Sequence, residues 1–165
     1  MKDGDSMDNM EFSPRALRAE GYFKEGYNCS QSVVLAFADL MDMDQKVLAR
    51  MASPFGGGMG RMREVCGAVS GMFLVLGYLR GYDDVQDRQA KIDLYAEVRM
   101  LAEQYQELNG SIVCRELLQG VPHTQGGVPE QRTESYYKKR PCGQLVAIAT
   151  QLLENHLRSK GVQGL

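Results

Sequence analysis

The longest uncharged segment of the chain predicts a central helix. Between Val65 and Leu79 no side chain carries a charge, and a helix that is apolar on every face is one enclosed by other elements. Two glycines one turn apart, Gly67 and Gly71, lie inside this segment, where each costs roughly 1 kcal/mol of helix stability relative to alanine. Glycine is favoured at such a place when another group must approach the backbone closely. The approaching group is either a neighbouring helix or a bound molecule.

The longest helical pattern follows Gly81. It runs from Asp84 to Leu108 and ends at the Asn109-Gly110 pair, which is a strong C-terminal stop signal. Its apolar positions are spaced four, three, four and three residues apart, which predicts a packing seam along one face. The seam consists of Leu94, Val98, Leu101, Tyr105 and Leu108.

Capping residues mark the starts of three helices in the first third of the chain. Ser13 followed by Pro14 predicts a helix that ends near Glu25. Asn28, with Gln31 three residues later, forms a capping-box pattern that opens a second helix. Asp44 caps a third helix, which reaches Ala52 and is stopped by Ser53-Pro54.

The last third of the chain predicts one short and one long helix separated by a loop. Ser111 caps the short segment IVCRELLQ, which Gly120 ends, and Pro141 opens the final helix. Residues 121–140 contain two prolines and two glycines with little periodicity, and we expect a long loop there. No segment alternates polar and apolar residues with a period of two. The predicted fold class is therefore all-α, a single-domain bundle of about six helices with no sheet.

Composition adds limits to this picture. We expect one domain over residues 13–160, preceded by a disordered acidic tail over residues 1–12. The formal net charge of −2 leaves no basic footprint for nucleic acid. The longest apolar run of the central helix, Met72 to Leu76, falls well short of the roughly 20 residues that span a bilayer. The acidic, polar N-terminus is unlike a secretory signal, so we expect a cytoplasmic protein.

The four cysteines share one predicted setting. Cys29, Cys66, Cys114 and Cys142 each fall within or beside the first turn of a predicted helix. The unpaired N–H groups and positive dipole at such a helix end stabilise a thiolate and lower a cysteine pKa. This favours reactive thiols. Two other interpretations stay open: cysteines packed as small hydrophobic residues, and ligands of a metal ion or iron–sulfur cluster, although no CxxC pair supports the latter.

The glycine run before the central helix is a second candidate site. Gly56 to Gly60 could form an anion-binding nest, with charge added by Arg61 and Arg63. It does not match a dinucleotide-binding fingerprint, because Arg63 stands where the third glycine belongs. A flexible loop that gives a partner thiol or cofactor access to Cys66 fits the run as well. The candidate cofactor-contacting glycines are Gly57, Gly58, Gly60, Gly67 and Gly71.

The chain resembles a family of putative redox-active proteins named for a C…GCAxxG…C…C pattern. The resemblance covers about residues 21–153 and rests on YNCSQSV, FGGGMGRMREVCGAVSG, CRELL and RPC, one segment around each cysteine. The core motif reads Cys66-Gly67-Ala68-Val69-Ser70-Gly71, with Cys and Gly in the reverse order from the family's written name. The resemblance implies redox activity that involves the four cysteines.

These observations favour thiol–disulfide exchange or electron transfer, with Cys66 as the most activated thiol and Cys29 as its resolving partner. Such an oxidoreductase requires no cofactor, and its partner is a redox protein or a small molecule. We assign no metal ligands, although a metal or iron–sulfur protein remains the rival interpretation. A third interpretation is a helical interaction module with inert cysteines, in which the seam from Leu94 to Leu108 is a homodimer face. Arg140 lies near Cys142 and is a candidate to hold its thiolate.

Overall fold

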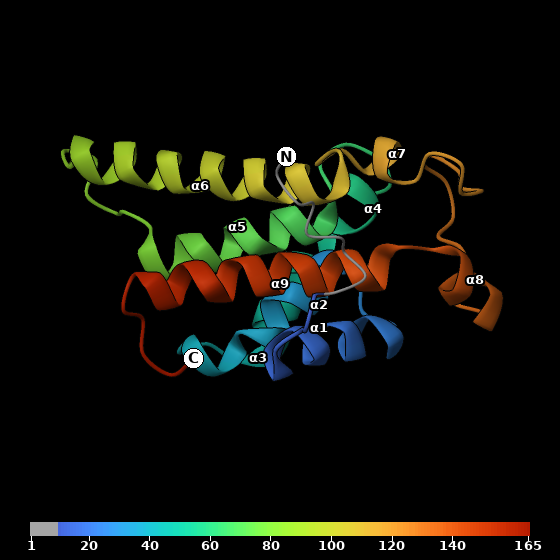
Figure 1. The fold of residues 1–165 in the computed structure, drawn as a ribbon, viewed down its shortest axis with the longest axis horizontal. Coiled ribbons are helices and arrows are strands. Elements are labelled where there is room, and N and C mark those ends of the chain that lie inside the picture. The colour runs from blue at the N-terminus through green and yellow to red at the C-terminus, as the bar shows by residue number, and fades with distance from the viewer. Residues whose placement is uncertain (1–9) are drawn as a thin grey trace, which may run out of the picture.

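The computed structural model describes residues 10–165 (Figure 1). Within these residues the chain is helical, with one isolated antiparallel β-bridge between Val65 and Val113 and no sheet. Six helices have eight residues or more, as the sequence predicts: α1 (Pro14–Lys24), α2 (Cys29–Ala36), α3 (Gln45–Ala52), α5 (Gly67–Arg80), α6 (Arg88–Asn109) and α9 (Cys142–Ser159). The shorter ones are α4 (Gly56–Met59), α7 (Cys114–Leu117), α8 (Glu134–Lys139), η2 (Ala38–Leu40) and η3 (Ser53–Phe55).

The expected acidic tail falls mostly outside the described part. Residues 1–9 are not among the described residues, and Met10 and Phe12 pack against the hydrophobic core. No helix in the described part of the chain is long and apolar enough to cross a membrane.

Two long helices begin at the same end of the molecule. Figure 1 shows α5 and α9 running side by side in the same direction, with α6 antiparallel to them on one side and α1 to α3 on the other. The short helices α4, α7 and α8 gather at the end where α5 and α9 begin. Helix α2 packs against α1, α5 and α9 and so joins the two sides.

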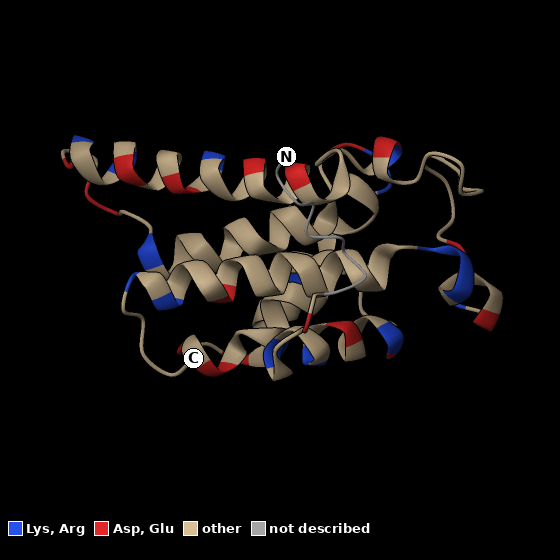
Figure 2. Cartoon of the chain, viewed as in Figure 1, with Lys and Arg blue, Asp and Glu red and all other residues tan. Residues whose placement is uncertain are grey.

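Helix α5 occupies the core along its first half. Ala68, Val69, Met72, Val75 and Leu76 have no exposed surface. The last turn is more open, since the side chain of Tyr78 is 43% exposed. Figure 2 shows that the ribbon of α5 is uncharged up to its C-terminal end, where Arg80 lies. The central position predicted from the uncharged segment is therefore correct for the N-terminal part of the helix.

Helix α2 approaches both α5 glycines. A Cβ atom added at Gly71 would lie 2.7 Å from the carbonyl oxygen of Ser30. One added at Gly67 would lie 2.8 Å from the carbonyl oxygen of Phe55 in η3 and 3.1 Å from the Cβ of Cys29. Ser30 and Cys29 belong to α2. The two glycines thus let α5 and α2 meet backbone to backbone at the end where both helices begin.

The predicted capping residues start their helices as expected. Ser13 accepts a hydrogen bond from Ala16 N–H, and Asp44 accepts from Lys46 and Val47. Asn28 and Gln31 form the complete reciprocal capping box.

Three boundaries differ from the prediction. Helix α6 begins at Arg88 rather than Asp84, because Asp84 accepts from Gln86 N–H in a turn and Asp87 provides the cap. Helix α7 is shorter than the predicted segment, since Ser111 bonds to Val113 N–H and does not cap a longer helix. The predicted loop over 121–140 contains α8, which Thr133 caps.

The apolar seam of α6 is used inside the chain. Leu101 and Tyr105 have no exposed surface, and Leu94, Val98 and Leu108 are partly buried against the core. Two of the five seam residues are thus buried in the core, and the other three pack against it.

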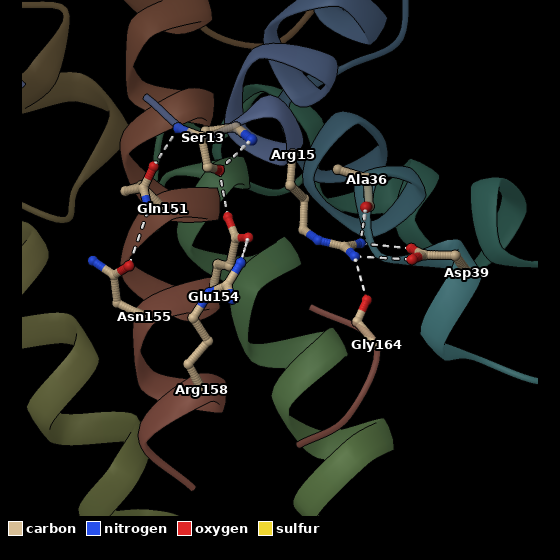
Figure 3. Close-up of polar contacts among 10 residues, drawn as sticks. Ser13, Arg15, Ala36, Asp39, Gln151, Glu154, Asn155, Arg158 and Gly164 are labelled. Atoms are coloured by element: carbon tan, nitrogen blue, oxygen red, sulfur yellow. Dashed lines mark hydrogen bonds and ion pairs between the residues drawn. The ribbon is translucent and has the colours of Figure 1, made fainter. Parts of the chain in front are cut away.

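Helix α1 is held to the C-terminal part of the chain by polar contacts (Figure 3). The buried guanidinium of Arg15 donates to both carboxylate oxygens of Asp39 and to the carbonyl oxygens of Ala36 and Gly164. Ser13 donates its backbone N–H to Gln151 and its hydroxyl to Glu154 of α9.

A buried charge cluster lies at the end of α5 far from its N-terminus. Glu97 of α6 accepts hydrogen bonds from Arg80 at 2.7 Å and pairs with His156 of α9 at 2.6 Å. The hydrogen bonds from Arg80 outweigh the effect of burial and lower the pKa of Glu97 to about 2. The cluster links α5, α6 and α9 through one carboxylate.

The two glycines of α5 provide a matched test of the packing. Gly71→Ala should destabilise the fold by roughly 1–3 kcal/mol, because the added methyl group meets the backbone of Ser30. Gly77→Ala, in the same helix with no atom within 4 Å of the new Cβ, should be stabilising by roughly 0.5–1 kcal/mol. Chemical denaturation measures both changes. Equal effects of the two substitutions would contradict the assigned contact.

The Glu97 cluster predicts a pH dependence of stability. Because the folded pKa is about 2 and lies below the ordinary value of 4.5, the carboxylate stabilises the fold above pH 4.5. This stabilisation is lost as the pH falls toward 2. Glu97→Gln should therefore lower the free energy of unfolding by roughly 3 kcal/mol at neutral pH and by much less at the acid end of that range. Glu103→Gln, on the exposed face of α6, is the control; a pH-independent loss in Glu97→Gln would refute the linkage.

Candidate functional site

The four cysteines meet at the end of the bundle where α5 and α9 begin. Cys29, Cys114 and Cys142 are the first residues of α2, α7 and α9, and Cys66 is the N-cap of α5. All four line one small cavity of about 50 Å³. We call these four residues the thiol centre. The helix-start setting predicted from the sequence is present for each of them.

A short backbone contact aligns two members of the thiol centre. Cys66 N–H donates to the carbonyl oxygen of Ile112 at 2.8 Å, and Cys114 N–H donates to that of Glu64 at 2.6 Å. These bonds flank the β-bridge at Val65. The segment that precedes α5 is thus tied to the segment that precedes α7, although the two are far apart in sequence.

Two of the predicted glycines make room for the cysteines. A Cβ atom at Gly58 would lie 2.7 Å from the Cβ of Cys114, and one at Gly67 would lie 3.1 Å from the Cβ of Cys29. Gly57, Gly58 and Gly67 line the cavity of the thiol centre. Gly60 lines a larger cavity next to it. Gly71 lines neither cavity and packs against α2.

The glycine run forms a left-handed turn. Residues 57 to 61 all have positive φ angles, and Arg63 has one as well. Backbone N–H groups of residues 60 to 64 donate to carbonyl oxygens of residues 54 to 59. The N–H groups of residues 60 to 64 are therefore bonded within the turn and do not point to a bound anion. The predicted anion-binding nest could not include these N–H groups. The turn instead directs the side chains of Arg61 and Arg63 inward, where both are buried.

Two members of the thiol centre are buried and disfavour the thiolate. Cys66 is 4% exposed and its Sγ lies 3.5 Å from the hydroxyl of Tyr105. Burial raises the pKa of Cys66 to about 11 despite this contact. Burial likewise raises the pKa of Cys114, although Arg63 Nη1 lies 3.8 Å from its Sγ and acts in the opposite direction.

The other two members, Cys29 and Cys142, are half-buried, and their thiols interact. This interaction lowers the pKa of the Cys142 thiol and raises that of Cys29 well above its ordinary value. The positive charges of Arg140, Arg132 and Arg63 lower the pKa of Cys142 further, against the opposing effect of burial. Of the four thiols, Cys142 is thus the one with a lowered pKa, whereas the pKa of Cys66, the most activated thiol expected from the sequence, is raised.

The arginines at the site were only partly foreseen. The sequence pattern indicates Arg140, Arg63 and Arg61. The charges of Arg140 and Arg63 lower the pKa of Cys142. Arg132 was missed because it lies in a segment without periodicity. Its guanidinium lies over the rings of Phe23 and Tyr136, with 4.3 and 4.9 Å to the centroids. A cationic residue a few positions from the aromatic pair Tyr136-Tyr137 is the sequence signal that indicates such a stacked arginine.

The thiol centre does not present a metal site in this arrangement. Among residues 10–165, no group of three or more His, Cys, Asp or Glu side chains is placed so that it could hold a metal ion. The cysteines are free thiols.

Comparison with known proteins agrees with the cysteine pattern. No curated protein and no solved structure matches the chain. One family model, described as "Putative redox-active protein (C_GCAxxG_C_C)", matches residues 27–156, which include all four cysteines. This match covers most of the chain, and the protein belongs to the C_GCAxxG_C_C family.

Proposed function

We propose that this protein carries out reversible dithiol–disulfide exchange through Cys142 and Cys29. The observation that carries the proposal is that these two half-buried thiols line one cavity and interact, which shifts their pKa values in opposite directions. A thiolate is the attacking species in such chemistry, and a neighbouring thiol is needed to resolve the mixed disulfide. Cys142 supplies the thiolate, and Cys29 supplies the resolving thiol.

Three effects support Cys142 as the thiolate. The interaction with the Cys29 thiol favours negative charge on the Cys142 sulfur, and three arginines add positive charge. Cys142 also stands at the N-terminus of α9, an 18-residue helix whose dipole favours negative charge there. Burial opposes these effects, and the net pKa direction is downward.

The exchange conserves atoms and electrons without a cofactor. The Cys142 thiolate attacks one sulfur of a substrate disulfide, forms a mixed disulfide and releases the other half as a thiolate. Cys29 then loses its proton to that thiolate or to water and attacks the Sγ of Cys142. The second half of the substrate leaves, and a Cys29–Cys142 disulfide forms. Two electrons have passed from the protein to the substrate, and a dithiol donor returns them in the reverse sequence.

The buried cysteines have a different place in this proposal. A thiol with a pKa of about 11 is almost fully protonated at neutral pH, so Cys66 is a poor nucleophile in the reduced protein. Cys66 and Cys114 line the same cavity and interact electrostatically with Cys142. Their substitution should therefore alter the rate of exchange without abolishing the first step.

Thiol alkylation over a pH series tests the assignment of the thiolate. With limiting iodoacetamide at neutral pH, Cys142 should be modified first and Cys66 last, because only thiolates react and Cys66 is both buried and protonated. Peptide mapping by mass spectrometry gives the order. Cys29→Ala removes the thiol whose interaction lowers the pKa of Cys142 and should move the alkylation midpoint of Cys142 to higher pH. Faster modification of Cys66 than of Cys142 would refute the assignment.

Trapping of the mixed disulfide tests the exchange itself. Reduced protein treated with 2-hydroxyethyl disulfide should lose two hydrogens and form a Cys29–Cys142 bond. Cys29→Ser should instead stop with one half of the reagent attached to Cys142, and Cys142→Ser should form neither product rapidly. Cys66→Ser is the matched control and should still form the internal disulfide. Intact-mass measurement distinguishes these products, and an internal disulfide in Cys142→Ser at the wild-type rate would contradict the mechanism.

A further inference from the structure

A second cavity adjoins the thiol centre. Its volume is about 310 Å³, near the lower end of the roughly 300–1,000 Å³ typical of small-molecule sites. It shares five lining residues with the cavity of the thiol centre: Asn28, Gly57, Arg63, Arg132 and Tyr136. A molecule in the larger cavity therefore lies next to the thiols.

The walls of this cavity carry a surplus of positive charge. Arg61, Arg63 and Arg132 line it, and Glu130 is the only acidic residue among those that do. Glu130 pairs closely with Arg140, at 2.6 Å. Its distances to Arg61 and Arg63 are longer, 3.8 Å each, so one carboxylate is shared among three arginines.

Arg63 lacks a full set of hydrogen bonds. Its side chain is buried, Nε donates to the carbonyl oxygen of Thr124 at 2.8 Å, and Nη1 contacts the sulfur of Cys114. Its Nη2 atom has no hydrogen-bond partner; the carboxylate of Glu130 lies 3.8 Å away and pairs more closely with Arg140. A buried guanidinium nitrogen without a hydrogen bond is costly, and a carboxylate is the group that pairs best with an arginine. The chain thus provides Arg63 with no anion at hydrogen-bonding distance of Nη2.

The backbone holds these arginines at an energetic cost. Arg61 and Arg63 both have positive φ angles, 64° and 59°. Such angles cost roughly 1–2 kcal/mol each for residues other than glycine. Non-glycine residues persist in this conformation where the surrounding structure requires their position, which is frequent at ligand sites.

We propose that the arginine-lined cavity binds the carboxylate end of a small anionic disulfide, so that its sulfur–sulfur bond faces the thiol centre. The inference rests on the proposed exchange and adds its substrate class. The carboxylate is held by Arg61, Arg63 and Arg132. The sulfurs undergo the two attacks described above, and both halves of the substrate leave as thiols that carry carboxylates.

Three disulfides of similar length but different charge test the inference. These are 3,3′-dithiodipropionate, which is anionic, 2-hydroxyethyl disulfide, which is neutral, and cystamine, which is cationic. The reduced protein should be oxidised fastest by the anionic reagent and slowest by the cationic one. Each rate is divided by that measured with free 2-mercaptoethanol, which corrects for the intrinsic reactivity of the reagent. The corrected preference for the anionic over the neutral disulfide should be roughly tenfold, as expected for favourable charge complementarity.

Two substitutions in the cavity should act in opposite directions. Arg61→Gln should reduce the anionic preference roughly fivefold, whereas Glu130→Gln should increase it by a similar factor, because each changes the local charge by one unit. The ratio between anionic and neutral reagents cancels any change in thiol reactivity. Arg99→Gln, on the exposed face of α6, is the control and should leave the ratio unchanged. Circular dichroism and thermal unfolding confirm that each variant is folded.

Binding of a non-reactive analogue separates this inference from the proposed function. Suberate has the length and charge of dithiodipropionate but no sulfur, and calorimetry should detect its binding to the wild type and weaker binding to Arg61→Gln. Suberate binding without exchange would refute the dithiol mechanism and retain the anion site. Exchange with equal corrected rates for all three disulfides, and no suberate binding, would overturn the anion site and leave the mechanism intact. Unchanged ratios in both cavity variants would likewise overturn it.

Discussion

Close contact between the backbones of α5 and α2 is the constraint on which the site depends. Gly71 and Gly67 bring α5 within van der Waals distance of Ser30 and Cys29. Because Cys66 precedes α5 and Cys29 begins α2, this contact brings two cysteines to the same place. A side chain larger than hydrogen at either glycine would force the helices apart and enlarge the thiol centre. The same helix contact therefore determines both the packing of the core and the geometry of the thiol centre.

Competition between burial and positive charge decides the direction in which the pKa of each cysteine is shifted. All four stand at helix starts, where the dipole stabilises an anion by roughly 0.3–1 kcal/mol. For Cys66 the rise in pKa from 9.0 to about 11 corresponds to about 3 kcal/mol in the opposite direction. Burial therefore overrides the helix end. Cys142 has the same kind of helix start, but it also has the thiol of Cys29 and three arginines beside it.

The left-handed turn between η3 and α5 links the cysteines to the arginines. Its glycines let Cys114 approach, as Gly58 shows, and its two strained arginines reach the adjoining cavity. The strain at Arg61 and Arg63 is compensated by their hydrogen bonds to Thr124 and Val128 in the loop that precedes α8. That loop also carries Glu130 and Arg132. The segment that had the weakest sequence pattern thus forms one wall of the proposed substrate site.

Local sequence determined the helices of this protein and the helix-start position of each cysteine. Capping side chains, proline and glycine act within a few residues of their own position, so Ser13, Asn28, Asp44 and Pro141 were sufficient to locate four helix starts. Tertiary structure alone decided that the thiols of Cys29 and Cys142 interact, because this depends on how α2 and α9 pack. It also decided that Cys66 is buried and that Arg132 lies beside Cys142. The burial of a thiol and the charges around it depend on residues distant in sequence, so a local sequence pattern does not predict them.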